Sequence, residues 1–93
     1  MAKPDGVLTS IKTADALVFT GQGKVYWVTA SAAATGGAAQ LNDSTDDGGT
    51  DKWSVVVAAN TSQTHSFDPP MDFETGIYAD IPGTNVTLTI GYK

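Results

Sequence analysis

The side chains best suited to catalysis in this sequence are a single histidine and the polar residues that follow it. His65 is the only histidine, with Ser66 and Asp68 close behind it. A nucleophilic triad needs a histidine beside both a nucleophile and an orienting acid. Adjacent residues of a strand point to opposite faces, so Ser66 would point away from His65. We therefore expect His65 to be a surface residue of a strand without a catalytic role.

An aspartate-rich segment, residues 43–51, is the candidate for a cation site. Aligned on a calcium-binding loop, Asp43, Thr45 and Asp47 take the first, third and fifth positions. The twelfth position is then Ser54, where such a loop needs a bidentate glutamate. The segment is therefore predicted to be a solvated hairpin loop, and we expect neither a metal site nor a cofactor.

Three further carboxylates, those of Asp72, Glu74 and Asp80, could supply the acid pair of a glycosidase. Nothing in their spacing favours such a pair over solvated strand edges. Residues 21–24 read Gly-Gln-Gly-Lys, which is too short for a phosphate-binding P-loop and lies between two predicted strands. With no credible nucleophile and base, we predict that the protein is not an enzyme and has no catalytic residues.

The elements that must position these residues are short strands separated by turns. Thr and Val, which favour strands, are abundant at 13 and 8 residues, and 10 glycines mark turns. No segment makes a convincing helix. The predicted strands are residues 7–11, 16–20, 24–31, 38–42, 52–59, 63–67, 73–81 and 86–92.

Alternation within these strands predicts which side chains face the core. Val7 is expected to be the first core position, on one face with Thr9 and Ile11. Pro69 and Pro70 cannot donate ladder hydrogen bonds, so they are expected to break the sheet, and Gly76 is expected at a bulge. The other residues predicted to face inward are Trp53, Val55, Val57, Val86, Leu88, Ile90 and Tyr92.

The fold class that follows is all-β, a single small antiparallel β-sandwich or barrel of about eight short strands. Residues 7–93 form the one domain that 93 residues allow, behind an N-terminal arm of residues 1–6. The chain has no cysteine, so no disulfide can stabilise this small core. Burial in an oligomer would add stability.

The charge pattern excludes two classes of partner. The net charge is -5, and the five basic residues are scattered lysines without any arginine. Binding to nucleic acid or to anionic membranes needs clustered basic side chains. The N-terminus lacks the apolar core of a secretion signal, so synthesis in the cytoplasm is expected.

Aromatic residues on strands are more often core or interface than ligand platforms. Tyr26 and Trp27 are neighbours on a predicted strand and should face opposite ways, one into the core and one toward a partner. An ordered arm at the N-terminus would suggest a second contact. The expected partner-contact residues are Met1, Ala2, Lys3, Pro4, Tyr26 and Trp27.

Several segments, taken in order, resemble small virion structural proteins of tailed bacteriophages. They are residues 7–12, 16–21, 41–53, 67–78 and 83–92. The most telling is Phe67-Asp68-Pro69-Pro70, followed by Phe73-Glu74-Thr75-Gly76-Ile77-Tyr78.

The resemblance implies a non-enzymatic β-sandwich protein of the particle. Proteins of this kind commonly decorate, or cement, the capsid, often as trimers over junctions between capsomers. It implies the major capsid protein as partner, a homotrimer and a place on the capsid surface, and it carries over no catalytic or metal residues. Two alternatives stay open: a tail, fibre or connector component, and a carbohydrate- or receptor-binding module. An exposed shallow patch of aromatics with Asp or Asn neighbours would mark the latter.

Overall fold

Eight β-strands make up the regular structure of the computed structural model, which describes residues 7–46, 48–83 and 85–93. Within these ranges no helix is present, and therefore none that is long and apolar enough to span a membrane. The strands are β1 (Leu8–Lys12), β2 (Ala16–Thr20), β3 (Gly23–Ala32), β4 (Gly37–Asp43), β5 (Thr50–Val57), β6 (Ser62–Phe73), β7 (Gly76–Asp80) and β8 (Val86–Tyr92).

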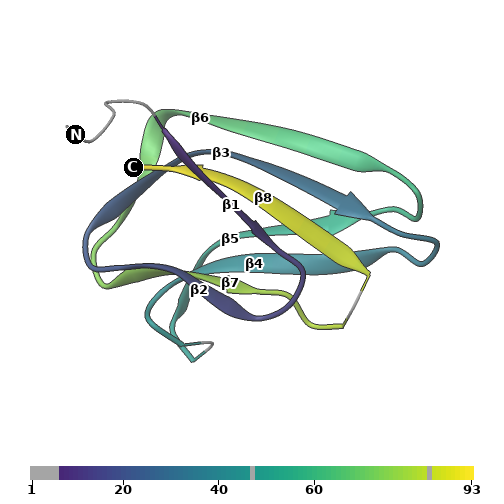
Figure 1. Cartoon of the computed structure of the whole chain (residues 1–93), viewed down its shortest axis with the longest axis horizontal. Helices are drawn as coiled ribbons and strands as arrows, with labels where there is room; N and C mark the ends of the chain where they lie inside the picture. Colours follow the sequence, from purple (N-terminus) through teal and green to yellow (C-terminus); the bar gives the residue numbers. More distant parts are fainter. Residues whose placement is uncertain (1–6, 47, 84) are drawn as a thin grey trace.

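The strands form two four-stranded antiparallel sheets that lie one over the other (Figure 1). One sheet has the order β1-β8-β3-β6 and the other β2-β7-β4-β5. The first strand pairs with the last, the second with the seventh, the third with the sixth and the fourth with the fifth, alternately in the two sheets. This is the strand order of a jelly roll. The predicted all-β class is confirmed, and of the two expected architectures the protein adopts the sandwich.

The core lies between the sheets and is built from the alternating strand positions. Of the seven other residues predicted to face inward, five are buried, while Trp53 and Tyr92 are half-buried against them. Among the residues that the structure describes, Phe73 has the largest fully buried side chain. The buried hydrophobic residues are Val25, Val28, Ala30, Ala39, Leu41, Val55, Val57, Phe73, Ile77, Ala79, Ile81, Val86, Leu88 and Ile90.

Strand β1 presents the opposite face to the one predicted. Val7 and Ile11 are 38% and 66% exposed, so Val7 is not a core position. In the pairing with β8, Leu8 lies opposite Tyr92 and Ser10 opposite the buried Ile90. Residues opposite each other share a face, so Leu8 and Ser10 point inward. The register against β8, rather than the pattern within β1, decides which side is buried.

The two prolines do not end the sheet, which corrects a second expectation. Strand β6 runs through Pro69 and Pro70 to Phe73. Its register against β3 shifts there, so that residues 67–70 bulge out of the ladder opposite Tyr26. Because β6 is an edge strand, residues that leave this ladder need no partner on the other side.

Gly76 begins β7 and does not lie in a bulge within one strand from 73 to 81. The chain bends at Glu74 and Thr75 as it passes from one sheet to the other. A Cβ atom on Gly76 would lie 2.8 Å from the carbonyl oxygen of Ser44 and 3.0 Å from that of Phe19. A glycine is required here because three segments of backbone meet.

Candidate functional site

His65 lies on the inward side of β6, where it is half-buried rather than on the surface as expected. Its ring meets Trp53 edge to face at a centroid distance of 5.5 Å, and its Nε2 lies 3.1 Å from Oε1 of Gln63. Trp53 also contacts Phe67, at 6.2 Å. These rings join β5 and β6, the edge strands on one side of the sandwich. Ser66 is exposed on the other face, so His65 has a packing role and no nucleophile beside it in the strand.

The aspartate-rich segment connects β4 to β5, which pair with each other, so the predicted hairpin is confirmed. The carboxylate of Asp46 accepts a hydrogen bond from the N–H of Gly48 at 2.9 Å, which shapes the turn. Asp47 lies outside the described residues. Across residues 7–46, 48–83 and 85–93, no three His, Cys, Asp or Glu side chains are grouped so as to hold a metal ion.

Asp43 turns away from this loop and caps the bend between β6 and β7. Its Oδ1 lies 3.1, 2.8 and 3.4 Å from the backbone nitrogens of Glu74, Thr75 and Gly76, which donate to it. Burial alone would raise the pKa of this carboxyl. The three N–H donors and the charge of Lys52 outweigh that effect and hold the pKa of Asp43 below its usual 3.8. Asp43 is therefore a structural anion that ties the two sheets together.

The three carboxylates considered for a glycosidase pair do not converge. Asp72 is exposed on β6 and forms an ion pair with Lys24. Glu74 lies in the bend that Asp43 caps. Asp80 belongs to β7 in the other sheet and alternates with the buried Ala79. This arrangement offers no acid pair on one surface.

Tyr26 and Trp27 both face outward, which corrects the expectation that they face opposite ways. Val25 and Val28 flank them, and both are completely buried. The register of β3 shifts between Val25 and Trp27 against both of its neighbours. Against β8, Tyr26 is the extra residue of a bulge. The bulge therefore places two consecutive aromatic residues on the outer face of one strand.

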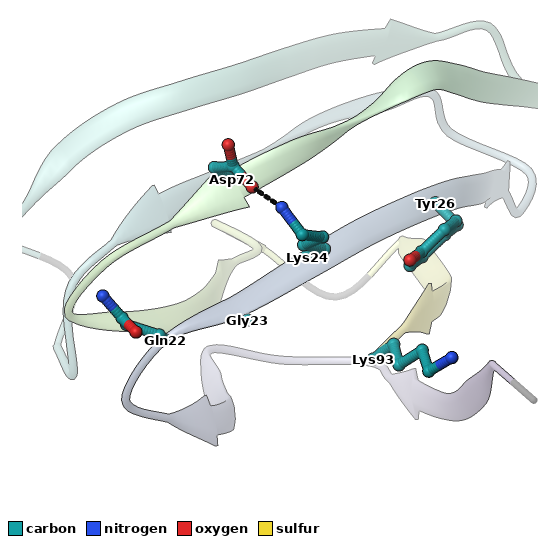
Figure 2. Close-up of a pocket in the computed structure, with 6 residues that line it drawn as sticks. All are labelled: Gln22, Gly23, Lys24, Tyr26, Asp72 and Lys93. Atoms are coloured by element: carbon teal, nitrogen blue, oxygen red, sulfur yellow. Dashed lines mark hydrogen bonds and ion pairs between the residues drawn. The ribbon is translucent and has the colours of Figure 1, made fainter. Parts of the chain in front are cut away.

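An open depression of about 360 Å³ lies beside Tyr26 (Figure 2). The ion pair of Lys24 and Asp72 occupies its middle, between Gln22 and Tyr26. Both the hydrogen bond to Asp72 and its negative charge raise the pKa of Lys24 above 10.5. Lys24 and Asp72 are directly opposite in the pairing of β3 with β6, although 48 positions separate them along the chain. The depression is lined by Gln22, Gly23, Lys24, Tyr26, Asp72 and Lys93.

Beyond this depression, the ladder residues that point outward from the same sheet are uncharged and rich in hydroxyl groups, and the exposed Asp68 lies outside the ladder, in the bulged segment of β6. Thr29 pairs with Thr89 on one side and with Thr64 on the other, where the two Oγ1 atoms lie 3.0 Å apart. Ile11 lies opposite Thr89 and is largely exposed. We call this surface the hydroxyl face. It consists of Thr9, Ile11, Trp27, Thr29, Ser31, Ser62, Thr64, Ser66, Thr87 and Thr89.

Trp27 lies over Gly91 at the end of the hydroxyl face that is next to Tyr26. A Cβ atom on Gly91 would overlap both Cε2 and Nε1 of the indole, so this ring fills the space of the missing side chain. Glycine covered by a cross-strand aromatic ring is a recurrent way of stabilising a sheet. Gly91 thus fixes the position in which Trp27 is presented to solvent.

The substitution Gly91→Ala is expected to displace Trp27 and to destabilise the fold by about 1–3 kcal/mol, because the new methyl group overlaps the indole. Urea unfolding would measure the loss, and Trp27 fluorescence in a Trp53→Phe background would report the displacement. Gly48→Ala is the control, since its nearest contact is 3.4 Å away. Wild-type stability and emission in Gly91→Ala would contradict this packing.

Of the six predicted partner-contact residues, Tyr26 and Trp27 are thus brought together on one outer surface. Met1, Ala2, Lys3 and Pro4 lie outside the described residues. In the sequence, Gln22 and Lys24 were considered only for a P-loop and Asp72 only for a glycosidase pair. Their common site was not predicted, because the turn and the register that unite them depend on distant segments. The alternation of Ser and Thr along β3, β6 and β8 can be seen in the sequence. Only the strand order shows that these side chains share one face of the sheet.

The similarity of this chain to known proteins is slight. No family model matches the chain, and no curated protein matches it. A solved structure of PirA is similar over 99% of this chain and 97% of that one, with 13% sequence identity and a TM-score of 0.45. The strand order of this chain itself defines its fold.

Proposed function

We propose that this chain is a non-enzymatic structural protein of a tailed-phage virion, a decoration protein that binds the capsid shell as a homotrimer. The resemblance of its segments to such proteins motivates the proposal. The observation that carries it is the hydroxyl face, on which the bulge of β3 adds Tyr26 at the rim beside Trp27. The major capsid protein is the proposed partner, and the capsid surface the proposed location.

The lack of charge on this face, and the aromatic residues Trp27 on it and Tyr26 at its rim, suit contact with a protein. Interface cores are depleted of charge and enriched in Trp and Tyr. None of the residues that form the hydroxyl face is charged, although the chain carries 15 charged residues. The molecule measures 41 by 26 by 25 Å, so a broad face approaches the roughly 800 Å² that one partner contributes to a stable interface.

The placement of the reactive side chains also supports a role without catalysis. His65 packs against Trp53, Asp43 caps a bend, and Asp72 is paired with Lys24. Each of these groups already has a structural partner.

The substitution Ile11→Lys is expected to weaken binding to undecorated shells at least tenfold, because it places a charge in an uncharged contact surface. Val56→Lys is the matched control. Val56 is also an exposed strand residue, 77% accessible, but it lies on the outer face of the other sheet. The measurement is occupancy on shells assembled from the capsid protein of the same phage, with the solution mass determined by light scattering.

Equal binding by Ile11→Lys and wild type would remove the hydroxyl face from the contact. A wild-type protein that does not bind shells, or that is monomeric and found only on tails, would contradict the decoration role and favour a tail, fibre or connector component.

A further inference from the structure

The depression at the turn end of β3 combines an aromatic ring with fixed hydrogen-bonding groups in an open hollow. Its volume of about 360 Å³ lies within the usual range for small-ligand sites, about 300–1,000 Å³. We propose that this depression binds a neutral sugar residue of a glycan. The proposal goes beyond the contact with the shell, because the depression lies past the hydroxyl face, where Lys24 and Asp72 introduce charge.

The Lys24–Asp72 pair supplies both kinds of hydrogen-bonding group that a sugar hydroxyl needs. Asp72 uses Oδ1 for Lys24, which leaves Oδ2 to accept from a ligand hydroxyl. The ammonium group of Lys24 has three donors, of which Asp72 engages one. Because each side chain holds the other in place, less conformational entropy is lost when a ligand binds.

Gln22 and Tyr26 complete the site from its two ends (Figure 2). The amide of Gln22 can donate and accept, and it follows Gly21, whose φ of 99° makes the turn between β2 and β3. The ring of Tyr26 has a negative face, which attracts the weakly positive C–H groups of a sugar ring. The bulge that turns Tyr26 outward therefore creates the apolar side of an otherwise polar hollow.

The charge of the site favours a neutral ligand over an anionic one. Lys24 and Asp72 neutralise each other, and both are substantially exposed, with side chains 49% and 68% accessible. The side chain of Lys93, the other charged residue of the lining, extends away from this pair (Figure 2). An anion would have to compete with Asp72 for Lys24 in a protein of net charge -5. A polyhydroxylated neutral ring can bond to both members without separating them.

The experiment is an NMR titration of the ¹⁵N-labelled full chain with methyl glycosides of glucose, galactose, mannose and N-acetylglucosamine. Glucuronate is the anionic comparison. We expect millimolar binding of at least one neutral glycoside, with shifts confined to residues 22–26, 72 and 93. Tyr26→Ala and Asp72→Asn should each reduce that affinity about tenfold, while Tyr26→Phe and the distant Val56→Ala should leave it unchanged.

Three results would overturn the proposal. One is the absence of binding by all four neutral glycosides. Another is binding of glucuronate alone, which would indicate attraction to lysine charge. The third is binding of a neutral glycoside whose affinity Tyr26→Ala and Asp72→Asn leave unchanged, which would place the sugar outside the depression. Because the titration needs no shells, its outcome is independent of the decoration role.

Discussion

Truncation of Phe73 to alanine is expected to lower the free energy of unfolding by about 3–5 kcal/mol. Phe73 is 1% exposed and has the largest fully buried side chain among the residues that the structure describes. It ends β6, just before the chain crosses to the other sheet at Gly76. A domain of this size is stable by only about 5–15 kcal/mol, so the loss removes a large share of the total.

Urea unfolding, followed by circular dichroism, would measure the change. Phe73→Leu keeps most of the buried volume and should cost less than about 1.5 kcal/mol. Val56→Ala serves as the exposed control and should change stability by no more than about 0.5 kcal/mol. A loss below about 1 kcal/mol in Phe73→Ala would show that the side chain is not part of the core.

The class of fold could be predicted from local pattern because several strands have one clearly apolar face. Val55 and Val57 alternate with polar or exposed positions in β5, and Leu88 and Ile90 do so in β8. A period of two residues is enough to identify such strands and their buried side. Strand β1 was different because Leu8 and Ile11 stand on opposite faces, so only the register with β8 could decide between them.

The irregular positions depended on contacts that no local pattern contains. The bulge at Tyr26 faces the prolines of β6, more than 40 positions away, and each irregularity accommodates the other. Proline is tolerated there because β6 is an edge strand, and that fact belongs to the topology. Of the surface that carries Tyr26 and Trp27, the sequence predicted these two aromatic residues as partner contacts. It did not predict that they share one face or which polar residues lie beside them.

The position of the charges also differs from what the net charge suggests. A net charge of -5 suggests binding to a basic surface through salt-sensitive contacts. The hydroxyl face instead carries no charge, and the carboxylate of Asp43 is committed to an internal cap. Net charge describes the whole molecule, whereas recognition depends on one face of it.

The second large effect is expected when the cap that Asp43 forms on the bend between β6 and β7 is removed. Asp43→Ala should destabilise the fold by about 1–3 kcal/mol, because three backbone N–H groups lose a charged acceptor at the crossing between the sheets. The folded-state pKa of Asp43 lies below its usual 3.8. Its stabilising contribution is therefore fully present above about pH 4 and is lost as the pH falls through the folded pKa.

Asp43→Asn tests the charge separately from the shape, since the amide oxygen still accepts hydrogen bonds. Urea unfolding as a function of pH is the measurement. Wild type should lose the contribution of Asp43 below about pH 4, whereas Asp43→Asn should start less stable and lack that part of the decline. Asp51→Asn is the matched control, because Asp51 is an exposed aspartate near the start of β5, away from the bend that Asp43 caps. If Asp43→Asn and Asp51→Asn gave the same stability and the same pH profile, the cap would contribute nothing. The bend would then be held by its backbone hydrogen bonds, which the N–H groups of Gly21 and Ser44 donate to the carbonyl groups of Thr75 and Gly76.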